Sequence, residues 1–360
     1  MDFINLKAQY AAYKTEIDAA IAKVLNSAQF IMGDEVDALE TALANYAGAK
    51  YAISCSSGTD ALLIALMALD VKEGDEVITA PFTFAATIEA IALCGAKIVF
   101  ADVKNGDANI DPAAIERAIS PKTKAIIPVS LYGNCADFDP INAIAGKYGV
   151  AVIEDGCQSF GASYKGAKSG ALSLIGATSF FPSKPLGCYG DGGAIFTSDD
   201  ALADAFARIR NHGQGERYEH ARIGLNGRLD ALQAAILRVK LAHFDDELRR
   251  RRDLAARYDE AFSDLNRIRY DQNSAIAQYT IRLRERERVA LDLKTRGVPT
   301  AIHYPKPLHL QSAYAHLGYK RGDFPVAEAL ANEVLSLPFS AFLTAQEQDQ
   351  VISAVKAVCL

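Results

Sequence analysis

The chain has 360 residues, of which 50% are hydrophobic and 23% are charged, and its formal net charge is −6. This length is enough for one large domain and one smaller domain, each with a buried core. Proteins that bind nucleic acid usually carry a basic excess, so the acidic balance argues against that class. The one dense basic run, residues 249–252, follows acidic residues 245–247 on a helical stretch, and this pattern is typical of a solvated helix face.

The sequence also argues against a membrane, secreted or metal-binding protein. No run of about 18 apolar residues is present, so no membrane-spanning helix is expected. The first seven residues lack the basic and apolar segments of a signal peptide. The six cysteines show no repeated spacing and no CxxC pair, which disfavours a zinc site or a disulfide framework. We expect a cytoplasmic protein with free thiols and no metal.

From about residue 50, short apolar runs alternate with helical patterns. Strands are expected at residues 50–54, 76–79, 97–101, 125–129 and 150–154, and helices at 59–69, 83–93 and 141–148. Two more strands, at 177–181 and 194–197, are joined by a glycine-rich connection too short for a helix. This alternation predicts an α/β fold in which a mainly parallel sheet of seven strands is covered by helices on both faces.

The pattern changes after residue 211. A long, charged and helical stretch is expected over residues 229–265, followed by a strand at 278–283 and helices at 287–295 and 345–358. A further helix is expected near the start, over residues 10–25. We therefore expect a large α/β domain over residues 12–240 and a small α+β domain over 241–360, with residues 1–11 packing near the small one.

Ligands of parallel sheets bind beyond the carboxyl ends of the strands, so the residues there are the candidate site. Residues 54–60 leave a strand and open a helix, and their small side chains suit an anion at a helix N-terminus. By itself, this segment is more simply an ordinary cap formed by Ser57 or Thr59. Residues 152–159 carry Glu154 and Asp155 at a strand end, where a surface or capping carboxylate is the simpler interpretation.

The third strand-end segment, residues 179–193, is more specific. Lys184 stands between Pro182 and Pro185 and is followed by four glycines. A lone lysine in a loop is usually solvated, but a lysine that the chain fixes and partly buries can act as a Schiff-base amine. The segment therefore favours Lys184 as a nucleophile.

Together these segments resemble the DegT/DnrJ/StrS family of sugar-nucleotide aminotransferases, which have the aspartate-aminotransferase-like fold of type I pyridoxal-phosphate enzymes. The ordered matches run along essentially the whole chain, at residues 3–6, 30–36, 57–62, 81–87, 154–155, 179–186, 224–228 and 303–305. Residues 127–133 and 179–197 most resemble the aminotransferases that act on UDP-2-acetamido-2-deoxy-3-oxo-glucuronate.

The resemblance implies pyridoxal 5′-phosphate as the cofactor and assigns catalytic roles. Lys184 is expected to carry the cofactor as a Schiff base and to move a proton during turnover. Asp155 is expected to pair with the pyridine nitrogen and keep it protonated. Gln158 is expected to reach the ring hydroxyl, and Phe84 to stack on the ring.

The resemblance also implies how the phosphate is held. Gly58, Thr59 and Ser179 are expected to bind it through backbone and hydroxyl donors. Asn226 is expected to reach the same phosphate from a second subunit, which implies a homodimer with shared active sites. Two departures from the family pattern, Gly156-Cys157 after Asp155 and Gly227 where relatives often have tyrosine, affect cofactor packing and the substrate entrance.

Four residues are implied to face the substrate: Arg228, His303, Tyr304 and His309. For each histidine, a packing role is an equal alternative. Arg228 is suited to a bidentate contact with a sugar carboxylate, although a structural ion pair is slightly favoured.

The implied activity transfers an amino group from an amino acid, with L-glutamate expected, to a nucleotide-linked keto sugar. The expected acceptor is a UDP-3-oxo-N-acetylhexosamine or its uronic acid, for surface polysaccharide synthesis. An alternative acceptor is a dTDP- or UDP-4-keto-6-deoxy sugar. A sugar dehydratase is disfavoured because such relatives replace the lysine by histidine, whereas position 184 is lysine. A non-enzymatic regulator is disfavoured because the sequence has no appended DNA-binding segment.

Overall fold

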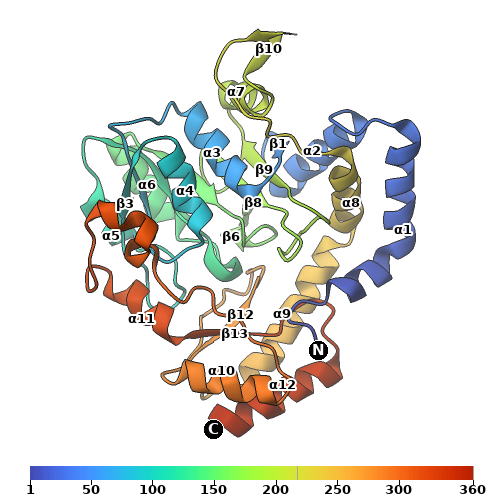
Figure 1. Cartoon of the computed structure of the whole chain (residues 1–360), viewed down its shortest axis with the longest axis vertical. Helices are drawn as coiled ribbons and strands as arrows, with labels where there is room; N and C mark the ends of the chain where they lie inside the picture. The colour runs from blue at the N-terminus through green and yellow to red at the C-terminus, as the bar shows by residue number, and fades with distance from the viewer. Residues whose placement is uncertain (217, 360) are drawn as a thin grey trace.

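A seven-stranded sheet forms the centre of the molecule in the computed structural model, which describes residues 1–216 and 218–359 (Figure 1). The strand order is β1-β9-β8-β5-β4-β2-β3. β9 runs antiparallel to both neighbours, and all other adjacent pairs are parallel. The bounds are β1 (Tyr51–Cys55), β2 (Glu76–Thr79), β3 (Lys97–Phe100), β4 (Thr123–Ile127), β5 (Ala151–Asp155), β8 (Ile175–Ser179) and β9 (Gly193–Thr197). The predicted α/β fold with a mainly parallel seven-stranded sheet is confirmed.

Helices cover this sheet because the apolar strand residues need burial on both faces. They are α2 (Asp34–Ala47), α3 (Gly58–Ala68), α4 (Ala85–Leu93), α5 (Pro112–Ala118), α6 (Phe138–Tyr148) and α7 (Asp200–Arg210). α3 is apolar nearly all round and packs against β8 and β9, as expected for a buried helix. The sequence patterns predicted α3, α4 and α6, whereas α2, α5 and α7 were not predicted.

The helical stretch expected over residues 229–265 consists of two helices. α8 (Ala231–Ala242) ends and α9 (Phe244–Ala261) begins at His243, whose ψ of 0° departs from helical geometry. α8 packs beside α1 (Leu6–Ser27) and α2, and α9 runs on towards the C-terminal part (Figure 1). α8 and the first turns of α9 share one core through Leu237, Phe244 and Leu248, whereas Ala255 and Tyr258 of α9 lie in the core of the C-terminal part.

The C-terminal part is built on the antiparallel pair β12 (Tyr279–Arg282) and β13 (Val334–Leu337). It adds α10 (Arg286–Thr295), α11 (Pro325–Glu333) and α12 (Ala345–Cys359). Tyr258 of α9 is buried in its core, and the N–H of Phe339 donates to the C=O of Phe3, so the chain start lies against this part. The domain boundary between residues 240 and 241 stays a prediction.

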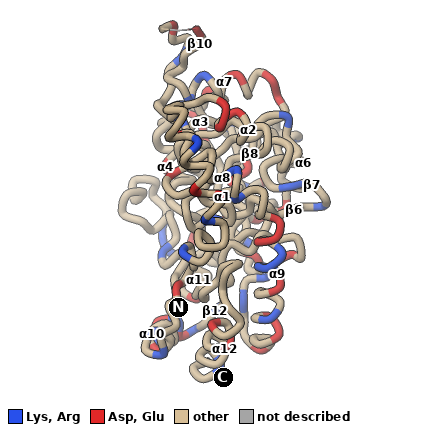
Figure 2. Tube along the Cα trace, turned by 90° about the vertical axis from the view of Figure 1, so that its right-hand side faces the viewer, with Lys and Arg blue, Asp and Glu red and all other residues tan. Residues whose placement is uncertain are grey.

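The remaining short elements lie in the connections: η1 (Leu131–Gly133), β6 (Ser163–Tyr164), β7 (Ala167–Lys168), β10 (Gln214–Glu216), β11 (Glu219–His220), η2 (Leu308–Leu310) and η3 (Ser312–Leu317). No helix of the described residues is long and apolar enough to cross a membrane. Figure 2 shows Lys and Arg interspersed with Asp and Glu along the trace, and the described residues form no continuous basic stripe in this view.

Candidate functional site

A cavity of about 430 Å³ opens beyond the carboxyl ends of β5 and β8, beside the N-terminus of α3. Its volume lies in the usual range for small-molecule and cofactor sites. Nine of the predicted site residues line it: Gly58, Thr59, Phe84, Asp155, Gln158, Ser179, Lys184, His303 and Tyr304. The fold thus brings together segments that are up to 246 positions apart in the sequence (304 − 58).

Asp155 is the last residue of β5 and is 4% exposed. Its Oδ2 accepts a hydrogen bond from Thr87 Oγ1 at 2.8 Å, and its Oδ1 accepts the N–H of Cys157 at 3.2 Å. It forms no ion pair with any described residue. Buried carboxylates are normally paired with a cation, so this site suits a ligand that presents a positively charged N–H.

Lys184 lies in the loop between β8 and β9. Its N–H donates to the C=O of Phe181 at 2.8 Å, which closes a tight turn. Burial, together with the nearby positive charge of Lys184, lowers the pKa of His303 to about 4. The imidazole of His303 is therefore neutral at physiological pH, and its Nδ1 lies 3.0 Å from Ser336 Oγ.

Gln158 and Tyr304 form a connected pair on the cavity wall. Gln158 Oε1 accepts the N–H of Tyr132 at 2.8 Å, and its Nε2 donates to the Tyr304 hydroxyl at 3.2 Å. Burial raises the pKa of Tyr304, so its phenol stays protonated. The amide of Gln158 has a second N–H, which is available to a ligand oxygen.

Phe84 lies at the mouth of the cavity, directly before α4, and is 55% exposed. Its ring centre lies 5.9 Å from that of Tyr304, with 37° between the ring planes. An exposed aromatic ring at a cavity mouth is suited to stacking on a flat heterocycle.

The N-terminus of α3 forms the part of the cavity that suits an anion. Ser57 Oγ caps the N–H of Asp60 at 3.0 Å, and the N–H groups of Gly58 and Thr59 have no intrahelical acceptor. A Cβ on Gly58 would lie 2.6 Å from Ser179 Cβ. Only glycine therefore lets β8 approach α3 this closely, and the result is a compact cradle of donors.

Three predicted site residues do not line this cavity. Asn226 is exposed and forms an antiparallel bridge with Asn211, and Arg228 Nη1 donates to Asn211 Oδ1 at 2.5 Å. His309 is buried against Phe100 and Phe324, and its Nε2 lies 3.1 Å from Glu328 Oε1. These contacts favour a packing role for His309, and its role towards the substrate stays a prediction.

Other residues that line the cavity were given no role from the sequence. Thr87 is the clearest, because it is buried and donates directly to Asp155. Its position three residues after Phe84, at helical spacing, is a signal that could have indicated a shared face. Cys157 also lines the cavity, and burial and the charge of Asp155 raise the pKa of its thiol well above the ordinary value.

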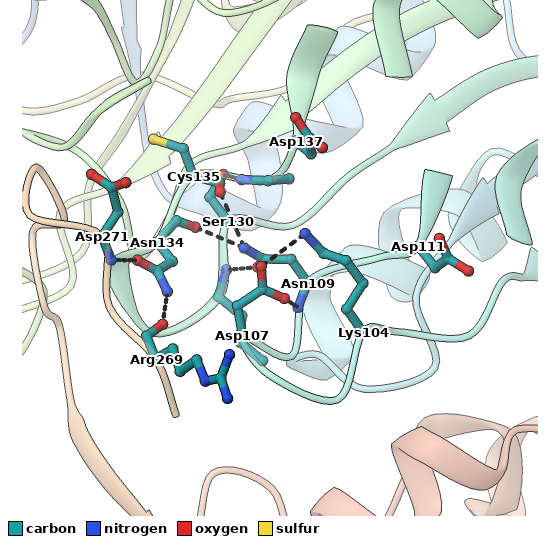
Figure 3. Close-up of polar contacts among 12 residues, drawn as sticks. Lys104, Asp107, Asn109, Asp111, Ser130, Asn134, Cys135, Asp137, Arg269 and Asp271 are labelled. Carbon is teal, nitrogen blue, oxygen red and sulfur yellow. Dashed lines mark hydrogen bonds and ion pairs between the residues drawn. The ribbon is translucent and has the colours of Figure 1, made fainter. Parts of the chain in front are cut away.

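A larger cavity of about 630 Å³ borders the segment 130–136 and includes Lys104 and Asp107 in its lining. Figure 3 shows polar contacts beside this cavity, several of which join a side chain to the backbone. Lys104 pairs with Asp107 at 2.9 Å, and Asn134 Oδ1 accepts the N–H of Asp271 at 2.9 Å. Asn109 accepts the N–H of Leu131, which steadies the segment that contacts Gln158. The larger cavity is thus connected to Gln158 of the smaller one through the segment 131–132.

Comparisons with known proteins agree with this geometry. A family model described as the DegT/DnrJ/EryC1/StrS aminotransferase family matches residues 12–356. The chain is 53% identical over 363 aligned positions to the UDP-2-acetamido-2-deoxy-3-oxo-D-glucuronate aminotransferase of Pseudomonas aeruginosa. That alignment covers 100% of this chain and 98% of the relative.

Two solved structures are similar over nearly the full length. DesV of S. venezuelae, in complex with a ketimine intermediate, has a TM-score of 0.97 and 39% identity, with 99% of this chain and 97% of that chain covered. NtdA of Bacillus subtilis, with bound cofactor PMP, has a TM-score of 0.94 and 30% identity, with 99% and 85% covered. These likenesses confirm the predicted aminotransferase fold. Sequence and structure agree, and the chain belongs to the DegT/DnrJ/EryC1/StrS aminotransferase family.

Proposed function

We propose that this protein is a pyridoxal-phosphate-dependent aminotransferase that transfers an amino group from an amino acid to a nucleotide-linked keto sugar. The observation that carries the proposal is one cavity that holds a lysine, a buried carboxylate without a cationic partner, and a helix N-terminus. These three features match the reactive aldehyde, the ring nitrogen and the phosphate of the cofactor.

The residues present fit that cofactor. Asp155 is buried and bonded only to neutral donors, so a protonated pyridine nitrogen completes its environment. Gly58 leaves room at the start of α3 for an anion where a Cβ would collide with Ser179. In this proposal Thr59 and Ser179 donate to the phosphate, Gln158 donates to the ring hydroxyl, and Phe84 covers the ring.

When bound, pyridoxal phosphate supplies a conjugated ring that accepts the electron pair from the bond broken at the substrate carbon. Lys184 would hold the cofactor covalently, and its amine would move the proton at the reacting carbon. Asp155 holds the proton on the ring nitrogen by its negative charge. Tyr304 and Gln158 keep each other in place, and the wall that they form with His303 excludes water from one side.

The relative named above acts on a UDP-linked 3-oxo-glucuronate, and we propose the same class of acceptor here, a UDP-3-oxo-N-acetylhexosamine or its uronic acid. In this proposal the neutral imidazole of His303 and the phenol of Tyr304 hydrogen-bond to sugar hydroxyl or oxo groups, which their position in the cavity lining supports. L-glutamate is the proposed amino donor, and the reaction takes place in the cytoplasm in this proposal.

A direct experiment combines the purified protein, pyridoxal phosphate and glutamate with a panel of UDP- and dTDP-linked 3-keto and 4-keto sugars. Mass spectrometry should show the mass change of oxo-to-amino replacement on a UDP-3-oxo sugar. Borohydride reduction of the loaded protein should label Lys184 alone, and Lys184→Ala should lose both the label and turnover. A label on another lysine, or no amino sugar from any member of the panel, contradicts the proposal.

We further propose a homodimer in which each cavity is completed by the partner. Supporting this, Asn226 is exposed and lies outside the cavity of its own chain, close to the β1 end, where Gly227 C=O accepts the N–H of Ser56. Arg228 is held nearby by Asn211. In this arrangement Asn226 binds the partner's phosphate and Arg228 faces the partner's sugar.

Mixing two inactive variants, Lys184→Ala and Asn226→Ala, tests the shared cavity. A mixed dimer then contains one cavity with both defects and one with neither, so activity should return towards a quarter of the wild-type value. Subunit exchange is verified separately with differently tagged chains. Exchange without recovery of activity would place Asn226 outside the partner's site.

A further inference from the structure

Lys240 is a buried lysine on α8 that lies outside the cavity, behind the loop that carries Lys184. Its side chain is 1% exposed, its Nζ donates to the C=O of Gly187, and it lies 4.9 Å from the centre of the Tyr189 ring. Burial lowers the pKa of Lys240 to about 8, and the charge of Glu247 opposes this shift. Taking an ammonium group out of water is unfavourable by several kcal/mol, so packing alone does not account for a lysine here.

The contact of Lys240 falls on the turn that presents Lys184. The N–H of Lys184 donates to the C=O of Phe181 at 2.8 Å, and this hydrogen bond closes the turn. A Cβ on Gly187 would lie 2.6 Å from the carbonyl oxygen of Pro182, so the end of the turn touches its beginning. Because these backbone segments are in direct contact, a group that fixes Gly187 also fixes the turn around Lys184.

A second side chain of α8 holds the same loop. Gln233 Oε1 accepts the N–H of Tyr189 at 2.8 Å, and a Cβ on Gly190 would lie only 3.2 Å from Gln233 Nε2. Lys240 and Gln233 are seven residues apart, which places them on one face of the helix, two turns from each other. They therefore form hydrogen bonds to the backbone on both sides of Cys188.

Other buried polar groups lie behind this contact. Glu247 of α9 is 2% exposed, and both of its carboxylate oxygens accept from Gln9 Nε2 of α1 at 2.9 Å. Arg251 is also buried, and the hydroxyl of Tyr189 has no partner among the described residues. Buried polar groups with incomplete hydrogen bonding lower stability, so their presence at one place favours a functional role. α1, α8 and α9 converge at this point (Figure 1).

We propose that Lys240 and Gln233 are positioning residues, which hold the turn of residues 181–187 so that the amine of Lys184 keeps one place in the cavity. This inference rests on the proposed function of Lys184. Neither residue lines the cavity, so each acts only through the loop backbone. Lys240 binds the carbonyl at Gly187, Gln233 binds the N–H of Tyr189, and Glu247 balances the charge of Lys240.

The test uses the full chain loaded with pyridoxal phosphate and compares the variants Lys240→Met and Gln233→Leu with the wild type. Arg238→Met is the matched control, because Arg238 is on the same helix but its side chain is 40% exposed and pairs with Glu35. The first readout is the pH midpoint of the absorbance change of the Lys184–cofactor bond. The second is the single-turnover rate with glutamate, measured per bound cofactor.

Both variants should shift the absorbance midpoint and slow the single turnover about tenfold to a hundredfold, since a misplacement of about 1 Å has effects of this size. The glutamate concentration at half-maximal rate should change less than about twofold, and Arg238→Met should match the wild type. Lys240→Arg keeps a charged donor and should recover part of the rate. A purely structural role would lower the melting temperature while leaving the midpoint and the rate per bound cofactor unchanged.

If Lys240→Met does not fold, Gln233→Leu decides the question, because Gln233 is only half-buried and its replacement leaves no buried charge. Folded variants with wild-type midpoints and rates would overturn the inference while the proposed function stands. A wild-type protein that forms no borohydride-stable bond at Lys184 would overturn the proposed function, and this inference with it. The borohydride control therefore separates the two failures.

Discussion

The hydrogen bond from Thr87 to Asp155 gives the sharpest quantitative test of the site. Thr87→Val replaces the hydroxyl by a methyl group of nearly the same size, so it removes the 2.8 Å bond to Asp155 Oδ2 without opening a cavity. The carboxylate then keeps only the longer contact with the N–H of Cys157, at 3.2 Å. With one donor fewer, Asp155 competes more strongly for the proton on the ring nitrogen, and the ring accepts electrons less well.

A hydrogen bond to a buried charged group contributes about 1.5–3 kcal/mol. Because about 1.4 kcal/mol corresponds to a factor of ten in rate, kcat/KM should fall about tenfold to a hundredfold. The assay is steady-state turnover with saturating pyridoxal phosphate, with the melting temperature measured in parallel. Cofactor saturation ensures that weaker loading does not appear as slower chemistry.

Thr83→Val is the matched control, since Thr83 Oγ1 lies 3.1 Å from Thr87 Oγ1 and is not bonded to Asp155. It makes the same chemical change just before α4, next to Thr87, and should keep most of the activity. Thr87→Ser retains the hydroxyl and should keep activity as well. Equal kcat/KM values for Thr87→Val and Thr83→Val would show that this hydrogen bond does not support the reaction.

Three further changes have expected outcomes. Asp155→Asn should have the circular dichroism spectrum of the folded wild type but lose nearly all turnover, since an amide carries no charge to hold a proton on the ring. A near-normal kcat would show that Asp155 has only a structural role. Gly58→Ala places a Cβ 2.6 Å from Ser179 Cβ, and such overpacking is unfavourable by about 1–3 kcal/mol. This variant should bind the cofactor more weakly, as measured by fluorescence. In the control Gly146→Ala the added Cβ meets open space, so this variant should bind the cofactor normally. The pKa of His303 is lowered to about 4, so the unfolded chain takes up a proton between about pH 6.5 and 4 that the folded chain does not. The free energy of urea unfolding of the apo protein should therefore decrease as the pH is lowered from about 6.5 to 4. The decrease should be less steep in His303→Gln, and identical slopes for the two proteins would refute the assignment.

Much of the fold was predictable from local patterns. Apolar runs of four or five residues, separated by helical periods, predicted all seven strands of the central sheet to within a few residues. The candidate site followed from the same patterns, because strand ends in a parallel sheet mark the ligand edge. Asp155 and Lys184 were therefore accessible from the sequence, each from its own segment and from the family resemblance.

Other features of the structure could not be predicted, because the short-range signals for them were weak. The charged stretch over residues 229–265 has unbroken helical character, and nothing in its composition indicates that the chain leaves helical geometry at His243. β8 ends at Ser179, two residues before the predicted end, because the chain turns there into the Lys184 loop. His309 resembles a substrate-facing residue in sequence, yet the fold buries it against Phe324 and pairs it with Glu328.

The sequence by itself thus determined the strands of the central sheet, some of its helices, the α/β class and the approximate positions of the strand ends, because hydrophobic periodicity and turn residues act over a few positions. Only the tertiary structure decided which side chains meet. Thr87 and Asp155 are 68 positions apart, Lys240 and Gly187 are 53 apart, and Gln158 and Tyr304 are 146 apart. Contacts of this kind form when distant segments are brought together by burial of the common core, so no local pattern encodes them.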